Sequence, residues 1–423
     1  MIVLYNILFF IGMTLSFPLI LLIVLLSDKR RKTVLQRLGL TRVPNFQFPI
    51  WIHALSVGEV LSVVPLVKAL KKRFGNIVFS ASTKTGFDIA NTLLKEHTDA
   101  VFFFPYDLIF SVKHLAKQIS PALVIIVETD IWPNFLFEMK KRNIPVLLVN
   151  ARLSKKSFLG YQRLSFFTKP LFLKFSEICA QSDEDTRRFG VIRGSSDHIR
   201  TTGNIKFDQA NDSVTAEEAE QLRKSMKVEP SRKILLAGST HKGEEEIILD
   251  VFSRVKKKYD DLLLIIVPRD PGRASAISRI FKSPGFSSVT MSELGKITPG
   301  EKTDVIIIDT IGLLRKLYAV ADIAFVGGSL VCSGGHNPLE PAVFSKPIIF
   351  GHDMSDFAEI ATLLLKSGGA VQVRDAESFY EAVIMFLSDP KKAQCAGYQA
   401  FKVFYANKGA VEKILQLIEN YQK

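Results

Sequence analysis

The sequence contains few of the residues that cross-link small secreted proteins or bind metals. Its 423 residues include three cysteines, Cys179, Cys332 and Cys395, which lie far apart and form no C-x-x-C pair. This disfavours a disulfide-stapled secreted scaffold and favours a reducing compartment. The seven histidines form no H-x-H or H-E-x-x-H pattern, so no metal is assigned. His53 and His336 are interpreted as structural or hydrogen-bonding residues.

Several motifs of familiar enzymes are also missing. The sequence has no G-x-S-x-G, no P-loop and no G-x-G-x-x-G. A serine hydrolase, a Walker ATPase and a Rossmann dinucleotide site are therefore not supported, and no cofactor is predicted.

Positive charge is in excess, with 55 Lys and Arg against 42 Asp and Glu, a net charge of +13. This balance favours an anionic partner, which could be nucleic acid, acidic lipid or a phosphorylated substrate. A nucleic-acid-binding protein would need stacking aromatics interleaved with basic residues, as in an RRM signature, and none is visible. We therefore predict no nucleic-acid partner.

Residues 1–26 carry no charged side chain, and a basic cluster follows at 29–32. The apolar run is long enough to cross a bilayer, and the charges follow it, whereas in a cleaved signal peptide they would precede it. We expect residues 1–27 to form a transmembrane anchor, with the body of the chain on the cytoplasmic side. The alternative is a buried core helix.

Residues 151–176 contain six basic and six aromatic side chains and no acidic one. This composition is typical of a segment that lies on an anionic membrane surface. The alternative is an interdomain helix pair with a solvated basic face.

Short apolar runs alternate with helical stretches through the rest of the chain. Runs of this kind predict parallel sheets that are covered on both faces. The first series is 49–55, 76–81, 100–104, 122–127, 145–149, 177–181 and 199–202, and the second is 233–237, 262–267, 304–308, 323–326, 347–350 and 370–373. With hydrophobic residues at 47%, the chain can form two α/β domains, each with a doubly wound, Rossmann-like parallel sheet. We expect domains at 28–210 and 231–423, joined by a linker at 211–230. The C-terminal helix could cross back to the first domain.

Polar residues follow the strands of the first series, where such folds bind ligands. Ser56 and Glu59 have the spacing of a capping box, and Glu59 could also take a proton from a hydroxyl. Glu128 and Asp130 open a Trp-Pro segment that is either functional or an N-cap cluster. Lys206 is either solvated or offsets the charge of a phosphate or carboxylate.

The second series ends in glycine-rich turns at 238–240 and 327–329. Pro268 and Arg269 follow one strand, and the turn Ile311-Gly312-Leu313 follows another. The stretch Asn337-Pro338-Leu339-Glu340 has capping-box spacing, but with two glycine pairs nearby it also suits a ribose and its phosphate.

Five motifs taken together resemble the Kdo transferases of Gram-negative bacteria, which are membrane-anchored glycosyltransferases of the GT-B fold. The resemblance covers the whole chain and is carried by Ser-Val-Gly-Glu59, Glu128-Thr-Asp-Ile-Trp-Pro-Asn134, Asn150-Ala-Arg-Leu-Ser154, Gly203-Asn-Ile-Lys-Phe-Asp208 and Gly334-Gly-His-Asn-Pro-Leu-Glu-Pro341. It implies two domains that face a central cleft, with closure of the two assembling the site. Another GT-B nucleotide-sugar transferase or epimerase is the alternative.

The resemblance implies transfer of 3-deoxy-D-manno-octulosonic acid (Kdo) from CMP-Kdo to a lipid A precursor, lipid IVA, without a metal. By position in the motifs, Glu59 would be the general base, and Glu128 and Lys206 would stabilise the transition state. The CMP contacts would be Pro268, Arg269, Ile311, Gly312, Leu313, Asn337, Pro338, Leu339 and Glu340. The sequence departs from the family pattern at Asp130, Asp270, Gly272 and Leu313.

Overall fold

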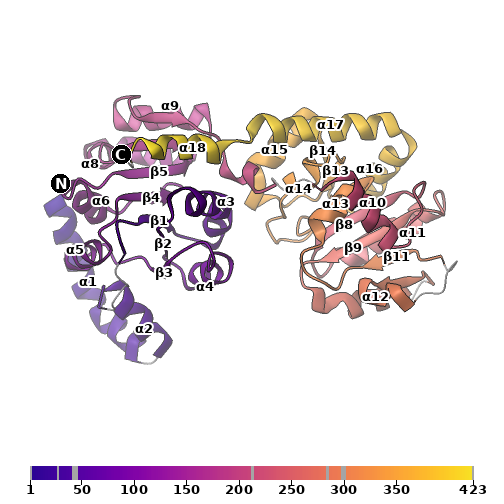
Figure 1. Cartoon of the computed structure of the whole chain (residues 1–423), viewed down its shortest axis with the longest axis horizontal. Coiled ribbons are helices and arrows are strands. Elements are labelled where there is room, and N and C mark those ends of the chain that lie inside the picture. The colour runs from indigo at the N-terminus through magenta and orange to yellow at the C-terminus, as the bar shows by residue number, and fades with distance from the viewer. Residues whose placement is uncertain are drawn as a thin grey trace. The chain divides into compact units, whose positions relative to one another are not determined.

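The computed structural model describes residues 2–25, 28–40, 46–210, 214–282, 285–296 and 302–421. The chain divides into two compact units: unit 1 comprises 1–209 and 408–423, and unit 2 comprises 210–407. Each unit contains a seven-stranded parallel sheet with helices packed against it (Figure 1). The predicted pair of parallel-sheet α/β domains is confirmed.

The sheet of unit 1 has the strand order β3-β2-β1-β4-β5-β6-β7. Its strands are β1 (Ile50–Ala54), β2 (Ile77–Ala81), β3 (Ala100–Phe103), β4 (Leu123–Val127), β5 (Val146–Ala151), β6 (Glu177–Ala180) and β7 (Ile199–Thr201). The strand order reverses between β1 and β4, which is where ligands bind in sheets of this type.

The helices of unit 1 cover both faces of this sheet and bury two apolar clusters against it. They are α1 (Ile2–Leu25), α2 (Asp28–Arg37), α3 (Val57–Phe74), α4 (Lys84–Leu93), α5 (Ile109–Ile119), α6 (Pro133–Lys141), α7 (Lys155–Arg163), α8 (Ser165–Phe172), α9 (Asp183–Arg193), the 3-10 helix η1 (Ile205–Ala210) and α18 (Ala410–Glu419).

The sheet of unit 2 has the order β10-β11-β9-β8-β12-β13-β14. Its strands are β8 (Ile234–Thr240), β9 (Leu263–Pro268), β10 (Ser288–Thr290), β11 (Val305–Ile307), β12 (Ile323–Val326), β13 (Ile348–Phe350) and β14 (Ala370–Gln372). All the predicted strands are present within a few residues of their expected bounds. The sequence analysis missed β10, a three-residue strand at the sheet edge.

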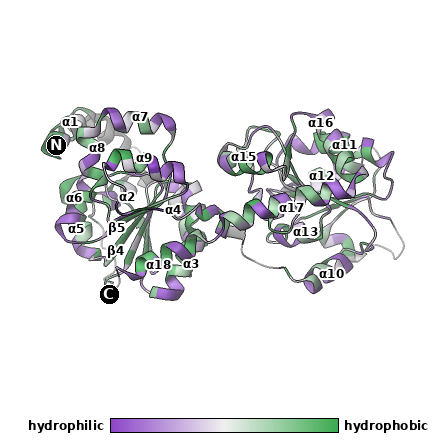
Figure 2. Ribbon diagram, turned by 90° about the horizontal axis from the view of Figure 1, so that it is seen from above, coloured by the Kyte–Doolittle hydropathy of each residue, from purple (hydrophilic) through white to green (hydrophobic). Residues whose placement is uncertain are grey.

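The helices of unit 2 likewise bury an apolar cluster on each face of the sheet. They are α10 (Ala216–Ser225), α11 (Glu244–Lys256), η2 (Pro271–Arg273), α12 (Ala274–Lys282), η3 (Met291–Lys296), α13 (Leu314–Val320), α14 (Leu339–Ala342), η4 (Ser355–Phe357), α15 (Ala358–Ser367), α16 (Ala376–Ser388) and α17 (Pro390–Asn407). In Figure 2 the outer helices carry both hydrophilic and hydrophobic colour, as expected for helices with one face on a sheet and one in solvent.

The last helix, α18, belongs to unit 1 although it follows the helices of unit 2 in sequence. Ile414 and Ile418 are fully buried in the cluster that α3 forms with the sheet. Asp208 accepts the N–H groups of Gly409 at 2.6 Å and Val411 at 2.7 Å, which caps the start of the helix. These hydrogen bonds therefore join the two stretches of sequence that make up unit 1, 1–209 and 408–423.

The segments at both ends of the predicted first domain differ from expectation. Over the residues that the structure describes, no helix is both long and apolar enough to cross a membrane, so the transmembrane helix predicted for 1–27 is not supported. In the expected linker at 211–230, residues 211–213 lie outside the described residues, as do Ser27 and Arg42 of the basic flank after the anchor. From residue 214 on, this stretch contains α10 and belongs to unit 2.

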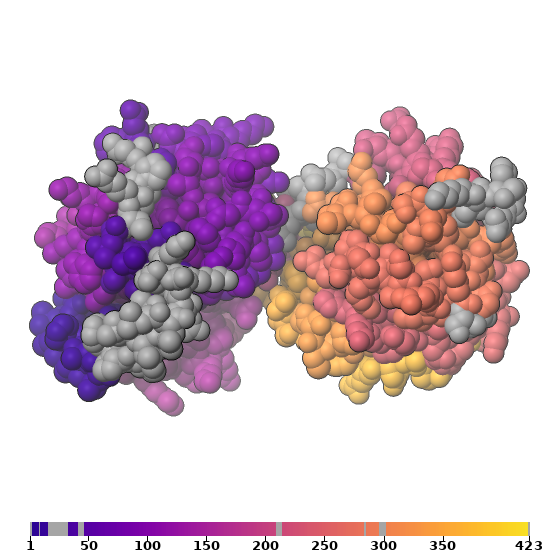
Figure 3. All heavy atoms as spheres, turned by 90° about the horizontal axis from the view of Figure 1, so that it is seen from below, coloured from indigo at the N-terminus to yellow at the C-terminus, as the bar shows by residue number. Residues whose placement is uncertain are grey.

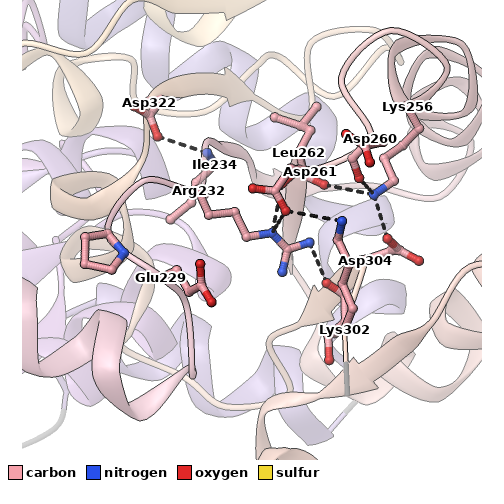
Figure 4. A network of polar contacts seen from close by, with 12 residues as sticks. Glu229, Arg232, Ile234, Lys256, Asp260, Asp261, Leu262, Lys302, Asp304 and Asp322 are labelled. Carbon is pink, nitrogen blue, oxygen red and sulfur yellow. Dashed lines mark hydrogen bonds and ion pairs between the residues drawn. The ribbon is translucent and has the colours of Figure 1, made fainter. Parts of the chain in front are cut away.

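A polar network connects the amino ends of the strands of unit 2 (Figure 4). The guanidinium of Arg232, just before β8, donates to the carbonyl oxygens of Asp261 at 2.9 Å and Thr303 at 2.7 Å. Lys256 Nζ lies 2.6 Å from the carboxylate of Asp304, just before β11. Buried hydrogen-bond partners of this kind fix the amino edge of the sheet.

We predict that Arg232→Ala lowers the free energy of unfolding of unit 2 by about 1–3 kcal/mol, because two carbonyl groups lose their donor. Urea denaturation followed by circular dichroism measures the change. The control is Lys302→Ala, which removes an exposed ion pair to Asp261 and should cost less than about 0.5 kcal/mol. Equal losses in the two variants would contradict the prediction.

Candidate active site

Glu59 lies in the first turn of α3, directly after β1. Ser56 is the N-cap residue, and its Oγ accepts the N–H of Glu59 at 3.4 Å. The carboxylate of Glu59 accepts the N–H of Leu55 at 2.6 Å and the hydroxyl of Ser56 at 3.0 Å. The predicted N-cap is present, but the carboxylate reaches Leu55, one residue further back than in a standard capping box.

The environment of Glu59 favours its protonated form. The residue is only 8% exposed. Burial raises the pKa of Glu59 to about 7; the charges of Glu128 and Asp130 act in the same direction, and the hydrogen bonds from Leu55 and Ser56 oppose it. A carboxylate that titrates near neutral pH is suited to accept a proton from a substrate hydroxyl. The capping and acid–base interpretations of Glu59 are therefore compatible.

Glu128 follows β4, the strand that pairs with β1. Its φ of 59° lies in the left-handed region, which is uncommon for a residue other than glycine. Its N–H donates to the carbonyl of Val149 at 2.9 Å. Burial raises the pKa of Glu128, and the charges of Lys206 and Arg152 lower it. Glu59 and Glu128 thus extend from adjacent strand ends at the reversal of strand order.

Asp130 holds the segment that leads into α6. Its carboxylate accepts the indole N–H of Trp132 at 2.8 Å and lies 3.1 Å from His53 Nε2. His53 is fully buried, and its ring stacks on that of Phe104 with centroids 3.8 Å apart. His53 is therefore a hydrogen-bonding residue, as predicted, and Trp132 both packs and donates.

Two cations act on Glu128. Lys206 lies in η1, and its N–H donates to Asn204 Oδ1 at 2.9 Å. Arg152 follows β5, and its carbonyl accepts the hydroxyl of Thr129. The sequence analysis counted Arg152 in the basic segment and in the motif Asn150-Ala-Arg-Leu-Ser154, but gave it no role in the site.

In unit 2 the ends of β8 and β12 approach each other closely. A Cβ atom on Gly327 would lie 2.5 Å from the carbonyl oxygen of Ser239, so the turn requires glycine. Glu244, at the start of α11, is fully buried and accepts the N–H groups of Gly328, Ser329 and Leu330 at 2.8–3.0 Å. Sequence reasoning missed Glu244 because its partners lie more than 80 residues away.

Several predicted CMP contacts come together beside Glu340. Arg269 follows Pro268, the last residue of β9, and its N–H donates to the carbonyl of Thr240 at 3.0 Å. Burial raises the pKa of Glu340, and the charges of Arg315 and Arg269 lower it. Arg315 was not predicted, and it is the second cation near this carboxylate.

A cavity of about 490 Å³ lies in this part of unit 2. Gly312 and Glu340, which belong to two separate segments predicted to contact CMP, both line this cavity. Arg315 supplies a positive charge at its wall. The lining consists of Val214, Glu218, Gly312, Leu314, Arg315, Lys316 and Glu340.

The other residues predicted to contact CMP lie at the starts of two short helices, α13 and α14. Leu313 is the N-cap residue of α13, and the side chain of Ile311 is 89% exposed. Asn337 Oδ1 accepts the N–H of Leu339 at 3.0 Å. Pro338 is the N-cap residue of α14 and lies inside the turn that Asn337 closes.

Two histidines share a hydrogen bond at the same edge of the sheet. His241 Nε2 and His336 Nε2 are 2.9 Å apart. Burial lowers the pKa of His336 to about 4, and the charges of Arg269 and His241 act in the same direction. His336 is thus a neutral hydrogen-bonding residue, as expected. Within the described parts of the chain, no cluster of three His, Cys, Asp or Glu side chains is arranged to hold a metal.

The basic aromatic segment 151–176 forms part of the body of unit 1. Phe172 and Phe175 are buried in the core, and Phe158, Tyr161 and Phe167 pack against it. Phe166 is 72% exposed. The aromatic side chains therefore mostly pack against the body of unit 1, while Lys155, Lys156, Arg163 and Lys169 are exposed.

Two parallel-sheet α/β units with polar loops at the carboxyl ends of their strands resemble, in fold, the GT-B glycosyltransferases and related epimerases. A crystal structure of UDP-GlcNAc 2-epimerase from Neisseria meningitidis bound to UDP-GlcNAc has this fold, with a TM-score of 0.58 and 14% sequence identity. The match covers 88% of this chain and 100% of that one.

The sequence narrows the class to one family. Residues 32–209 match the family described as 3-deoxy-D-manno-octulosonic-acid transferase (kdotransferase). The chain is 34% identical to the 3-deoxy-D-manno-octulosonic acid transferase of Haemophilus influenzae, over 93% of this chain and 92% of that protein. It is 32% identical to the transferase of the same name from Rickettsia bellii, over 99% of both.

The chain therefore belongs to the Kdo transferase family, and the resemblance seen in the five motifs is confirmed. It is a glycosyltransferase of lipopolysaccharide biosynthesis.

We predict that Glu59→Gln changes the pH dependence of stability. The pKa of Glu59 is about 7 in the folded chain and 4.5 in its ordinary state. Ionisation therefore lowers the free energy of unfolding as pH rises between these values, and glutamine removes that loss. The difference between the unfolding midpoint of the variant and that of the wild type should therefore be larger at about pH 8 than at about pH 5.

Tryptophan fluorescence measures this change selectively, because both tryptophans, Trp51 and Trp132, lie in unit 1. The control is Glu96→Gln, which changes an exposed glutamate of the same unit. A midpoint difference for Glu59→Gln that is the same at both pH values would show that the burial of Glu59 does not perturb its titration.

Proposed function

We propose that this enzyme transfers Kdo from CMP-Kdo to a lipid A precursor, lipid IVA. The observation that carries the proposal is the placement of Glu59 beside Glu128, at the reversal of strand order in unit 1, in a chain that belongs to the Kdo transferase family. This is the position at which an α/β sheet presents polar side chains to a ligand.

In the proposed reaction, Glu59 is the general base. An acceptor hydroxyl attacks the anomeric carbon of Kdo and gives its proton to the Glu59 carboxylate. The new glycosidic C–O bond forms as the bond between the anomeric carbon and the phosphate oxygen breaks, and CMP leaves with the electron pair. The near-neutral pKa of Glu59 supports this role, because the ionised form is available at working pH.

Glu128 and Lys206 would stabilise the transition state. The anomeric carbon becomes electron-poor as CMP leaves, so a nearby carboxylate favours that charge distribution. The positive charges of Lys206 and Arg152 lower the pKa of Glu128 and so favour its ionised form.

Unit 2 would bind the CMP half of the donor. The proposed contacts are Pro268, Arg269, Ile311, Gly312, Leu313, Asn337, Pro338, Leu339 and Glu340. Support comes from the cavity beside Gly312 and Glu340, and from the positive charges of Arg269 and Arg315 near that carboxylate. Arginine suits the phosphate of a leaving nucleotide. The proposed reaction uses no metal or cofactor.

A lipid acceptor requires the enzyme to reach a membrane, and we propose the cytoplasmic face of the inner membrane. In unit 1, α1 exposes an apolar set comprising Val3, Leu4, Ile7, Phe10, Ile11 and Leu15. The indigo atoms of this first part of the chain lie at the surface in Figure 3.

Tyr5 and Asn6 attach α1 to the body of unit 1. The hydroxyl of Tyr5 donates to Asp107 at 2.9 Å, and Asn6 exchanges amide hydrogen bonds with Asn134 at 2.7 and 2.9 Å. The ring of Tyr5 lies 6.3 Å from that of Phe167 in α8. The apolar residues of α1 and the exposed basic residues of α7 and α8 thus lie on connected elements, which suits an anionic lipid surface.

We predict that the wild-type enzyme incubated with CMP-Kdo and lipid IVA gives a product heavier by whole Kdo units in mass spectrometry. Glu59→Gln should lower the rate about 10²–10⁴-fold, because the proton acceptor is lost. Stabilisation by CMP in a thermal-shift assay should be unchanged, since the proposed nucleotide contacts lie in unit 2. Glu96→Gln is the matched control and should retain the activity.

A product from UDP-sugars and none from CMP-Kdo would contradict the proposed donor. Wild-type activity in Glu59→Gln would contradict the proposed base while leaving the donor and acceptor in place.

We predict that Phe10→Ser combined with Phe166→Ser reduces binding to anionic lipid vesicles by about tenfold, because two exposed apolar side chains are lost. Vesicle flotation measures the bound fraction. Tyr398→Ser, which changes an exposed aromatic residue of unit 2, is the control and should bind as the wild type does. Binding that is unaffected by the double substitution would place the membrane contact elsewhere.

A further inference from the structure

Asn150 has an unusual backbone at the end of β5. Its φ is 54°, in the left-handed region, and the register between β5 and β6 shifts between Leu148 and Ala151. Asparagine tolerates this conformation better than most residues, although glycine adopts it at no steric cost. The side chain is fully buried. A backbone requirement alone therefore does not explain why this residue carries a buried amide.

The buried amide is bonded to the turn that carries Lys206. Asn150 Oδ1 accepts the N–H of Ile205 at 3.1 Å, at the start of η1. The backbone carbonyl of Asn150 accepts Gln181 Nε2 at 2.9 Å, and Gln181 Oε1 accepts Asn204 Nδ2 at 3.0 Å. Asn204 Oδ1 in turn accepts the N–H of Lys206 at 2.9 Å. The loop after β7 is thus fixed at two consecutive N–H groups.

The same part of β5 fixes Glu128. The carbonyl of Val149, next to Asn150, accepts the N–H of Glu128 at 2.9 Å. On the other side of Asn150 in sequence, the carbonyl of Arg152 accepts the hydroxyl of Thr129. The end of β5 therefore contacts both the segment that carries Glu128 and the turn that carries Lys206, and Asn150 lies between the two.

We infer that Asn150 is a positioning residue for the transfer reaction: its side-chain oxygen holds the Ile205–Lys206 turn, and with it the lysine whose positive charge acts on Glu128. The inference rests on the proposed function, in which these two residues stabilise the transition state. Asn150 itself need not touch either substrate.

The second amide atom of Asn150 supports this role. Among the residues that the structure describes, Nδ2 is buried and has no hydrogen-bond partner. An unpaired buried donor costs about 1–3 kcal/mol of stability, and glycine at this position would avoid that cost. Compared with glycine, asparagine adds the Oδ1 atom that accepts the N–H of Ile205. The need to hold that turn therefore explains why asparagine stands at this position.

The test is Asn150→Gly, which keeps the left-handed backbone and removes the acceptor. We expect kcat for Kdo transfer to fall about tenfold or more while KM for CMP-Kdo stays within about twofold, since the donor contacts lie in unit 2. The matched control is Asn143→Gly, because Asn143 also has a left-handed φ of 57° but lies exposed before β5. The control should keep the wild-type kcat.

A double-mutant cycle with Lys206→Ala shows whether Asn150 acts through the lysine. If it does, Asn150→Gly changes kcat by less than about twofold once Lys206 is absent. The same fold-loss in both backgrounds, or an unchanged kcat in Asn150→Gly, overturns the inference. An unchanged kcat in Lys206→Ala alone removes the proposed role of the lysine, and this inference with it.

Asn204→Ala provides a second route to the same turn if Asn150→Gly does not fold. It removes the acceptor for the Lys206 N–H and leaves Asn150 intact, so we expect a lower kcat with an unchanged KM for CMP-Kdo. Tryptophan fluorescence checks that unit 1 is folded in each variant. A folded Asn204→Ala enzyme with wild-type kcat counts against the positioning network.

Discussion

The candidate sites of both units depend on the parallel pairing of β1 with β4 and of β8 with β12. Because parallel strands end at the same edge, residues that are far apart in sequence are collected there. In unit 2 the opposite edge is occupied by the Arg232 network, which fixes the amino ends of the strands. The amino ends of these strands therefore contribute to the stability of unit 2, and their carboxyl ends carry the polar loops of the candidate site.

Glu59 and Glu244 show how the same location leads to different chemistry. Each lies in the first turn of the helix that follows the first strand of its unit. Glu244 accepts three backbone N–H groups from the loop after β12, so its carboxylate is committed to holding that loop. Glu59 accepts two hydrogen bonds and lies near two other acids, which leaves it suited to exchange a proton.

The sequence was sufficient to predict the strands, the two α/β domains and the family, because apolar runs and motif order are local signals. It missed β10, whose three residues are too few for such a signal. Arg152, Asn150 and Glu244 were missed as site residues because their roles depend on partners brought together by the fold. The apolar composition of the first segment predicted a membrane span, whereas no helix among the described residues is long and apolar enough to cross a membrane.

The return of α18 to unit 1 affects the order in which the chain can fold. Ala410, Ile414, Leu415 and Ile418 are part of the cluster that covers one face of the first sheet. During synthesis this face stays incomplete until those residues emerge, whereas all of unit 2 has been made by then. A nascent chain therefore carries an unfinished amino-terminal half past a finished later one, and would expose apolar surface to chaperones throughout that interval.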